Sequence, residues 1–144
     1  MMYQLTVLPD EAAYRHLYLQ TYCNPVIPII TFDGIQVRFF ADRFDHAFFE
    51  SFNRKLADKA QFSLVRAQRI LWIKDTLEDP TADLRVGWDK KSKSYDKSFR
   101  VAVVKYNYVV IIWVKGNSQA KFITAYEADN SIGKILGSPV WTGQ

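Results

Sequence analysis

The seven residues from Tyr108 to Val114 form an almost unbroken apolar run that is rich in β-branched side chains. A run of this length and composition is typical of a central β-strand that is covered on both faces. Before it, residues 99–106 alternate as a strand does, with Val101 and Val103 on one face and Ala102 and Val104 on the other. After it, the turn-forming residues 115–118 lead into a third strand over residues 119–126. These patterns predict an antiparallel sheet whose strands are joined by short turns.

A fourth strand and two helices complete the predicted core. Residues 84–88 form a short strand ahead of the other three. Phenylalanine or leucine recurs at every fourth position between 44 and 56, which predicts an amphipathic helix over residues 42–56. A second helix is predicted from Ser63, a good N-cap, to Leu77, because Asp79-Pro80 then ends it.

The first 40 residues predict a smaller unit. Residues 10–22 begin with Asp10, an N-cap residue, and continue as a helix. Two β-rich runs, 26–32 and 35–40, flank Asp33-Gly34, which is a strong hairpin signal. We therefore predict an α+β fold. In it, two core helices pack on a four-stranded antiparallel sheet in residues 41–144, and residues 1–40 add a helix and β-hairpin extension.

Composition excludes several classes of function. The chain has one cysteine, Cys23, and two histidines, His16 and His46, so an internal disulfide and a cysteine-based zinc cluster are excluded. The glycines are scattered and form no phosphate-binding loop. No apolar run is long enough to span a bilayer, and the first residues lack the features of a secretory signal. We expect a cytoplasmic protein that uses neither a metal nor a cofactor.

Positive charge is concentrated in residues 85–121. This segment holds nine basic and two acidic residues, a net charge of +7, so the rest of the chain carries −3. The basic residues are Arg85, Lys90, Lys91, Lys93, Lys97, Arg100, Lys105, Lys115 and Lys121. Such segregation favours a polyanionic partner, nucleic acid above all. Trp88, Tyr95 and Lys90 are suited to single-stranded RNA. A solvated lysine-rich loop is the alternative.

Three further features are candidates for chemistry. His46 lies off the apolar stripe of its helix and titrates near neutrality, as a general acid or base must. Arg100 lies between apolar residues on a strand, where a guanidinium can hold a phosphate with two hydrogen bonds. Strand alternation predicts that Phe122, Thr124 and Tyr126 share one face, which suits a phosphate-bearing ligand. An exposed histidine, a surface arginine and ordinary strand residues are the alternatives.

Arg66 lies within the apolar arc of the second helix. Its guanidinium is expected either to extend out to solvent or to point into a polar cleft beside the core. His16 and Cys23 are expected to have no chemical role.

The order of these motifs resembles the phage-associated members of the BECR nuclease superfamily (barnase, EndoU, colicin and RelE-like). The matching features are a helix with His46 in Phe44-Asp45-His46-Ala47-Phe48, a helix that begins Arg66-Ala67-Gln68-Arg69, a basic strand, and a last strand that reads Phe122-Ile123-Thr124-Ala125-Tyr126. The resemblance covers residues 40–128. Its members are small ribonucleases that need no metal and pack helices on a four-stranded antiparallel sheet.

The resemblance implies a metal-independent endoribonuclease that cleaves RNA by attack of the 2′-hydroxyl on the adjacent phosphate, as in a toxin or phage effector. By this resemblance His46 is the general acid or base, Arg100 stabilises charge on the phosphate, and Thr124 and Tyr126 hold the phosphate or a base. The predicted RNA-binding residues are Arg66, Arg69, Lys90, Lys91, Lys93, Tyr95, Lys97, Lys105 and Lys121. An acidic inhibitor (antitoxin) protein is an implied partner. The alternative is a non-catalytic RNA-binding or protein-interaction module on the same fold.

Overall fold

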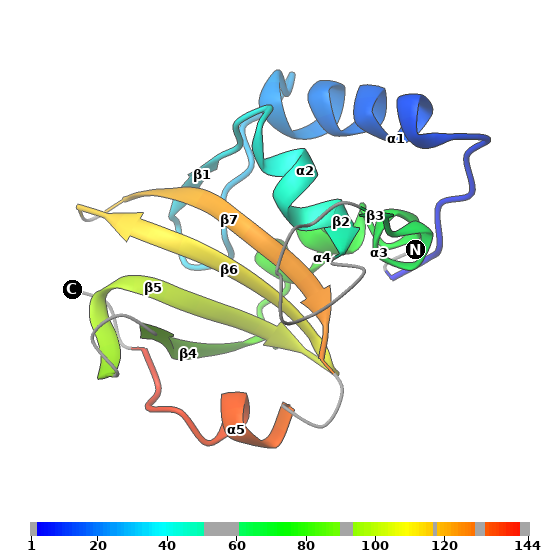
Figure 1. Cartoon of the computed structure of the whole chain (residues 1–144). Coiled ribbons are helices and arrows are strands. Elements are labelled where there is room, and N and C mark those ends of the chain that lie inside the picture. Colours follow the sequence, from blue (N-terminus) through cyan, green and yellow to red (C-terminus); the bar gives the residue numbers. More distant parts are fainter. Residues whose placement is uncertain (1–2, 51–60, 90–93, 117, 129–131, 142–144) are drawn as a thin grey trace.

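Four antiparallel strands form the centre of the molecule, in the order in which they occur along the chain (Figure 1). The computed structural model describes residues 3–50, 61–89, 94–116, 118–128 and 132–141, with the backbone alone for 87–89 and 94–100. The strands are β4 (Asp83–Asp89), β5 (Ser94–Lys105), β6 (Tyr108–Lys115) and β7 (Gln119–Glu127). The predicted antiparallel arrangement of these strands is therefore confirmed.

A fifth strand makes the sheet mixed, which the sequence did not predict. β1 (Gln36–Arg38) pairs in parallel with the first residues of β7, so the sheet order is β1-β7-β6-β5-β4. The predicted turn at Asp33-Gly34 is present, with Gly34 at φ +93°. However, its first arm contributes an isolated bridge from Ile30 to Gln36 and no strand. The second arm joins the main sheet, because Val37 has a buried position beside Ala120 there.

The helices differ from prediction mainly in where they end. α1 (Glu11–Tyr18) continues as a π-helical turn, η1 (Leu19–Cys23), and Asp10 caps it as predicted. α2 (Arg43–Phe48) stops early, because β2 (Phe49–Glu50) pairs with β3 (Gln61–Phe62). Residues 52 and 56 of the predicted helix lie outside the described residues. The helix predicted over 63–77 is two helices, α3 (Leu64–Gln68) and α4 (Trp72–Glu78), and Ser63 is the N-cap of the first.

The two faces of the sheet are covered differently. Helices α1 to α4 lie on one side, and their apolar residues share one cluster with Val101, Val103 and Phe122. On the other side, which we call the outer face, α5 (Ile132–Leu136) packs over Ala102, Val104 and Val109. The predicted alternation of β5 is confirmed at residues 101–104, and the predicted coverage of β6 on both faces holds as far as Ile112, whereas Trp113 is exposed on the outer face.

A β-bulge changes the predicted faces of β7. Ile111 pairs with Thr124 and Ile112 pairs with Phe122, so Ile123 is an extra residue in β7. Phe122 and Ala125 both lie in the cluster beneath the helices, whereas Tyr126 packs on the outer face. The prediction that residues 122, 124 and 126 share one face is wrong, because the extra residue shifts the alternation between 122 and 124.

The N-terminal residues belong to the same cluster as the sheet. Tyr14, Tyr18 and Tyr22 of α1 and η1 are almost fully buried there, together with Phe39 and Phe122. In the described part of the chain, the longest apolar helix falls short of the length needed to cross a membrane.

Candidate functional site

A transverse row of residues crosses four strands on the outer face. Arg38 of β1 pairs with Lys121 of β7, Lys121 pairs with Trp113 of β6, and Trp113 pairs with Arg100 of β5. Val37, Val114 and Val101, each one position along its own strand, lie in the cluster under the helices. Because strand residues alternate between faces, Arg38, Lys121 and Trp113 belong to the outer face. Arg100 takes the fourth register position, and its side chain lies outside the described residues.

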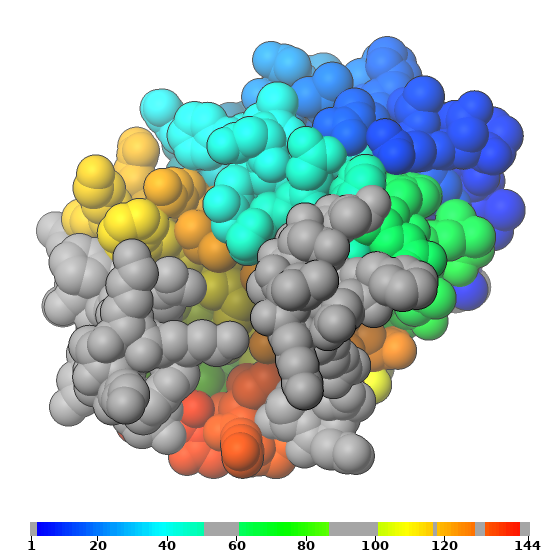
Figure 2. Space-filling view, viewed as in Figure 1, coloured from blue at the N-terminus to red at the C-terminus, as the bar shows by residue number. Residues whose placement is uncertain are grey.

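A groove of about 650 Å³ lies over the β1 end of this row, and we call it the β1–β7 groove. Four basic side chains line it: Arg38, Arg43, Lys115 and Lys121. Its other lining includes the rings of Phe40 and Trp113 and a single carboxylate, that of Asp42. Figure 2 shows the surface of residues 36–50 (cyan) beside that of β6 and β7 (yellow and orange). The excess of positive charge makes the groove suited to an anionic ligand.

Trp113 and Lys121 lie side by side in the lining of the groove. The Lys121 ammonium lies 4.6 Å from the centre of the Trp113 ring, which is a cation–π contact. Trp113 is 36% exposed, a large fraction for a tryptophan on a strand. An aromatic ring beside ammonium and guanidinium groups is the combination that binds the bases and phosphates of a single strand.

Arg43 fixes α2 against the bulge of β7. Its guanidinium donates two hydrogen bonds to the carbonyl of Ile123, from Nε at 3.0 Å and from Nη2 at 2.7 Å. Thr124 is the next residue of the strand, and it is half-buried. His46 is exposed and lies one helical turn after Arg43. We call the two hydrogen bonds from Arg43 to Ile123 the clamp. The clamp holds the helix that carries His46 beside the strand that carries Thr124.

Arg66 links α2 to Tyr126. Its guanidinium donates from Nη1 to the carbonyl of Ala47, the residue after His46, at 3.3 Å. It lies 6.0 Å from the centre of the Tyr126 ring and forms an ion pair with Glu50 at 3.3 Å. The guanidinium is therefore held beside the core by its polar partners and does not extend fully into solvent.

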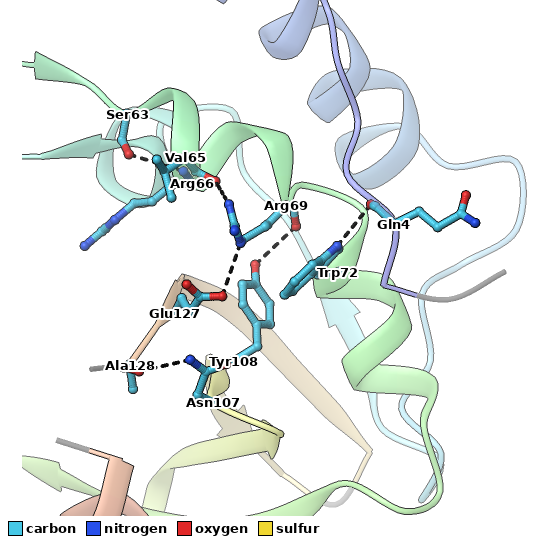
Figure 3. A network of polar contacts seen from close by, with 10 residues as sticks. All are labelled: Gln4, Ser63, Val65, Arg66, Arg69, Trp72, Asn107, Tyr108, Glu127 and Ala128. Atoms are coloured by element: carbon cyan, nitrogen blue, oxygen red, sulfur yellow. Dashed lines mark hydrogen bonds and ion pairs between the residues drawn. The ribbon is translucent and has the colours of Figure 1, made fainter. Parts of the chain in front are cut away.

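Arg69 belongs to a polar network on the helical side of the sheet (Figure 3). It donates to the carbonyl of Val65 at 2.8 Å, pairs with Glu127 at 3.3 Å and lies over the ring of Trp72. Tyr108 donates its hydroxyl to the carbonyl of Arg69 at 3.4 Å, and burial raises the pKa of that hydroxyl. The structure therefore separates Arg69 from the outer-face groove.

The remaining predicted RNA-binding residues fall into two groups. Lys105 lies near α4, where its ammonium contacts the Thr81 hydroxyl at 2.5 Å and the Asp79 carboxylate at 4.0 Å. Lys90, Lys91 and Lys93 lie outside the described residues, and Tyr95 and Lys97 are described by their backbone alone, on β5. Of the predicted residues, the described contacts bring Lys121 into the groove, and His46, Arg66, Thr124 and Tyr126 into the region around α2 and β7.

Arg38, Arg43 and Trp113 were not predicted from the sequence as members of a site. Trp113 was detectable, because counting back from the turn at Gly116 places residue 113 opposite residue 121. Arg38 was not detectable, since its position depends on the parallel pairing of β1 with a strand 83 residues later. Among the described residues, no group of three or more His, Cys, Asp or Glu side chains is arranged to hold a metal ion.

Comparisons of this chain with protein-family models, with curated proteins and with solved structures gave no match.

Proposed function

We propose that this chain is a metal-independent endoribonuclease of the BECR type that binds RNA on the outer face of its sheet. The observation that carries the proposal is the clamp from Arg43 to Ile123, which joins the helix of the exposed His46 to the strand of Thr124, while Arg43 itself lines a groove with three further basic side chains. A group that transfers protons near neutral pH, next to cations that bind phosphate, is what RNA cleavage without a metal requires.

In this proposal the reaction is attack of a ribose 2′-hydroxyl on the adjacent phosphorus. A bond forms from the 2′-oxygen to phosphorus, and the bond from phosphorus to the 5′-oxygen breaks. The 2′-hydroxyl gives up its proton and the departing 5′-oxygen gains one, so the products are a 2′,3′-cyclic phosphate and a 5′-hydroxyl. His46 carries out one of these proton transfers, and the basic side chains stabilise the charge that develops on the phosphate.

Cleavage of RNA in the presence of EDTA tests the proposal. We expect fragments that end in a cyclic phosphate, and we expect His46→Ala to slow their formation by about 10²- to 10⁴-fold, the usual contribution of a general acid or base. Arg15→Ala is the matched control, because Arg15 pairs with Asp45, the neighbour of His46 on α2, and is not among the residues that line the groove. RNA that stays intact with folded wild-type protein would overturn the proposal.

The second candidate is a non-catalytic RNA-binding module on the same fold. Two observations favour it. Arg66 and Arg69 already pair with Glu50 and Glu127, so these guanidiniums are engaged within the protein. In addition, the other histidine of the chain, His16, is exposed on α1, in a different part of the fold, so it does not supply the second proton transfer beside His46. Under this alternative, His46→Ala leaves RNA affinity unchanged while Lys121→Ala lowers it.

A further inference from the structure

We infer that the β1–β7 groove is a subsite for a short, unpaired stretch of RNA that crosses the strands of the sheet, with one base against Trp113 and its phosphates on Arg38, Lys121 and Lys115. This inference rests on the proposed function, because the bound strand is the substrate, and it adds a binding site and a selectivity that the cleavage proposal does not contain.

The direction in which the RNA crosses the sheet follows from the register of the β-strands. Arg38, Lys121 and Trp113 lie side by side on adjacent strands, and Arg100 holds the next register position. Strands are about 4.8 Å apart, so the row extends about 14 Å across the sheet. Along the strands, by contrast, α5 covers the outer face at Ala102, Val104 and Val109. The described positive charge therefore runs from Arg38 of β1 to Lys121 of β7 and includes Lys115 at the end of β6, whereas α5 covers the opposite end of the outer face.

The selectivity for unpaired RNA follows from Trp113. A base can stack on a tryptophan ring only when it is not stacked inside a duplex. Trp113 is 36% exposed, and the Lys121 ammonium, which lies over its ring at 4.6 Å from the centre, brings a positive charge next to the ring that would bind the base. A duplex can present only its phosphates to this groove, because its bases are stacked inside the helix, so it lacks the stacking interaction with Trp113.

The size of the row sets the length of RNA that fills it. Because the row is only about 14 Å long, we expect it to take a segment at the lower end of the range of single-strand binding sites, about 4 nucleotides. Three phosphate contacts predict that the logarithm of the binding constant falls with the logarithm of salt concentration with a slope of about −2, at about −0.7 per contact.

The test measures binding of wild-type protein to 2′-O-methyl RNA, which lacks the attacking hydroxyl and so stays intact. We expect a tetranucleotide to bind nearly as tightly as a decanucleotide, and a duplex of the same sequence to bind at least about tenfold more weakly.

Trp113→Ala is expected to weaken single-strand binding about tenfold or more, whereas Trp113→Phe retains most of the affinity. Lys121→Ala is expected to reduce the salt slope by about 0.7. Lys134→Ala, on exposed α5, is the matched control.

Equal affinity for duplex and single strand, or unchanged binding by Trp113→Ala in a folded protein, would overturn the inference. The two proposals fail separately. If cleavage depends on His46 but these groove variants bind normally, the nuclease stands and the subsite is wrong. If the groove binds single strands as described and no RNA is cut, the subsite stands, the nuclease is wrong, and the chain is the non-catalytic module.

Discussion

Asp79 shows how one residue at the end of a helix organises its surroundings. Its carboxylate accepts hydrogen bonds from the backbone of Thr81 at 2.8 Å, from the Thr81 hydroxyl at 2.6 Å and from the Tyr3 hydroxyl at 3.2 Å. These bonds, with the Thr81 side chain first among them and the Lys105 ammonium a smaller contributor, lower the pKa of Asp79. Burial, together with the carboxylates around it, raises the pKa of Tyr3 to about 12. The favoured protonation states are therefore an ionised Asp79 carboxylate and a neutral Tyr3 phenol.

The lowered pKa of Asp79 predicts a loss of stability in acid. Its contribution is fully present above the pKa of an unfolded aspartate, about 3.9, and is lost as the pH falls through the lower pKa of the folded state. Asp79→Asn removes this contribution, so we expect the difference in stability between wild type and variant to be largest near neutral pH and to shrink below about pH 4. Urea unfolding across this range measures it.

Asp83→Asn is the control for this experiment, since the Asp83 side chain is 56% exposed and lies 3.7 Å from its partner Arg85. A stability difference between wild type and Asp79→Asn that stays constant with pH would contradict the assignment.

Single residues with a local role were the ones that the sequence predicted. Asp10 and Ser63 act as N-caps because a side-chain oxygen needs only the backbone three residues ahead, and their bonds to Ala13 and Arg66 have that geometry. His46 was correctly expected off the apolar stripe of α2. The partners of Arg43 and Arg66 could not be predicted, because they depend on how separate elements pack.

At the scale of elements, the bulge in β7 is the feature that most changes the site. Residues 119–126 alternate regularly in sequence, and nothing local to Ile123 indicates an extra residue. The carbonyl that the bulge exposes is bound by Arg43, 80 residues earlier in the chain. The sequence thus predicted the strand and its neighbours, but not the shift that places Thr124 and Tyr126 on the outer face apart from Phe122.

We expect Arg43→Ala to destabilise the fold by about 1.5–3 kcal/mol, the usual contribution of hydrogen bonds that involve a charged group. Arg43→Lys keeps the charge but cannot reproduce both bonds to Ile123, so its stability is expected to lie between those of Arg43→Ala and wild type. Urea unfolding measures the stability, and hydrogen exchange at Thr124 reports the bulge itself. If Arg43→Ala is as stable as wild type and exchange is unchanged, the clamp does not hold the bulge.

Helix α2 illustrates the limit of periodicity as a predictor. Phe44 and Phe48 are buried as the four-residue spacing requires, yet Phe49 leaves the helix at ψ 149° and pairs with Phe62. A sequence cannot distinguish continued helix from this exit when the competing interaction is a strand pairing made by residues more than ten positions away.

At the scale of the whole molecule, the first 40 residues are part of what forms the core. The Tyr18 ring contacts Phe39, Phe44 and Phe122, and its hydroxyl donates to the carbonyl of Phe40 at 2.8 Å. β1 also supplies Arg38 to the groove. Removal of these residues would expose the apolar face beneath β7 and delete one wall of the candidate site.

We therefore expect a chain that begins at residue 41 not to fold, and Tyr18→Ala in the full chain to lose about 3–5 kcal/mol, the range for deleting a large buried aromatic side chain. Circular dichroism and urea unfolding measure both. Val26→Ala is the control, since Val26 is fully exposed and its loss is expected to change stability little.

A folded chain from residue 41 would show instead that the sheet and helices α2 to α4 form an independent domain, with the helix and turn before it as an addition. Comparing its RNA affinity with that of the full chain would then isolate what Arg38 contributes, because the truncation removes that basic residue of the groove and leaves Arg43, Lys115 and Lys121 in place.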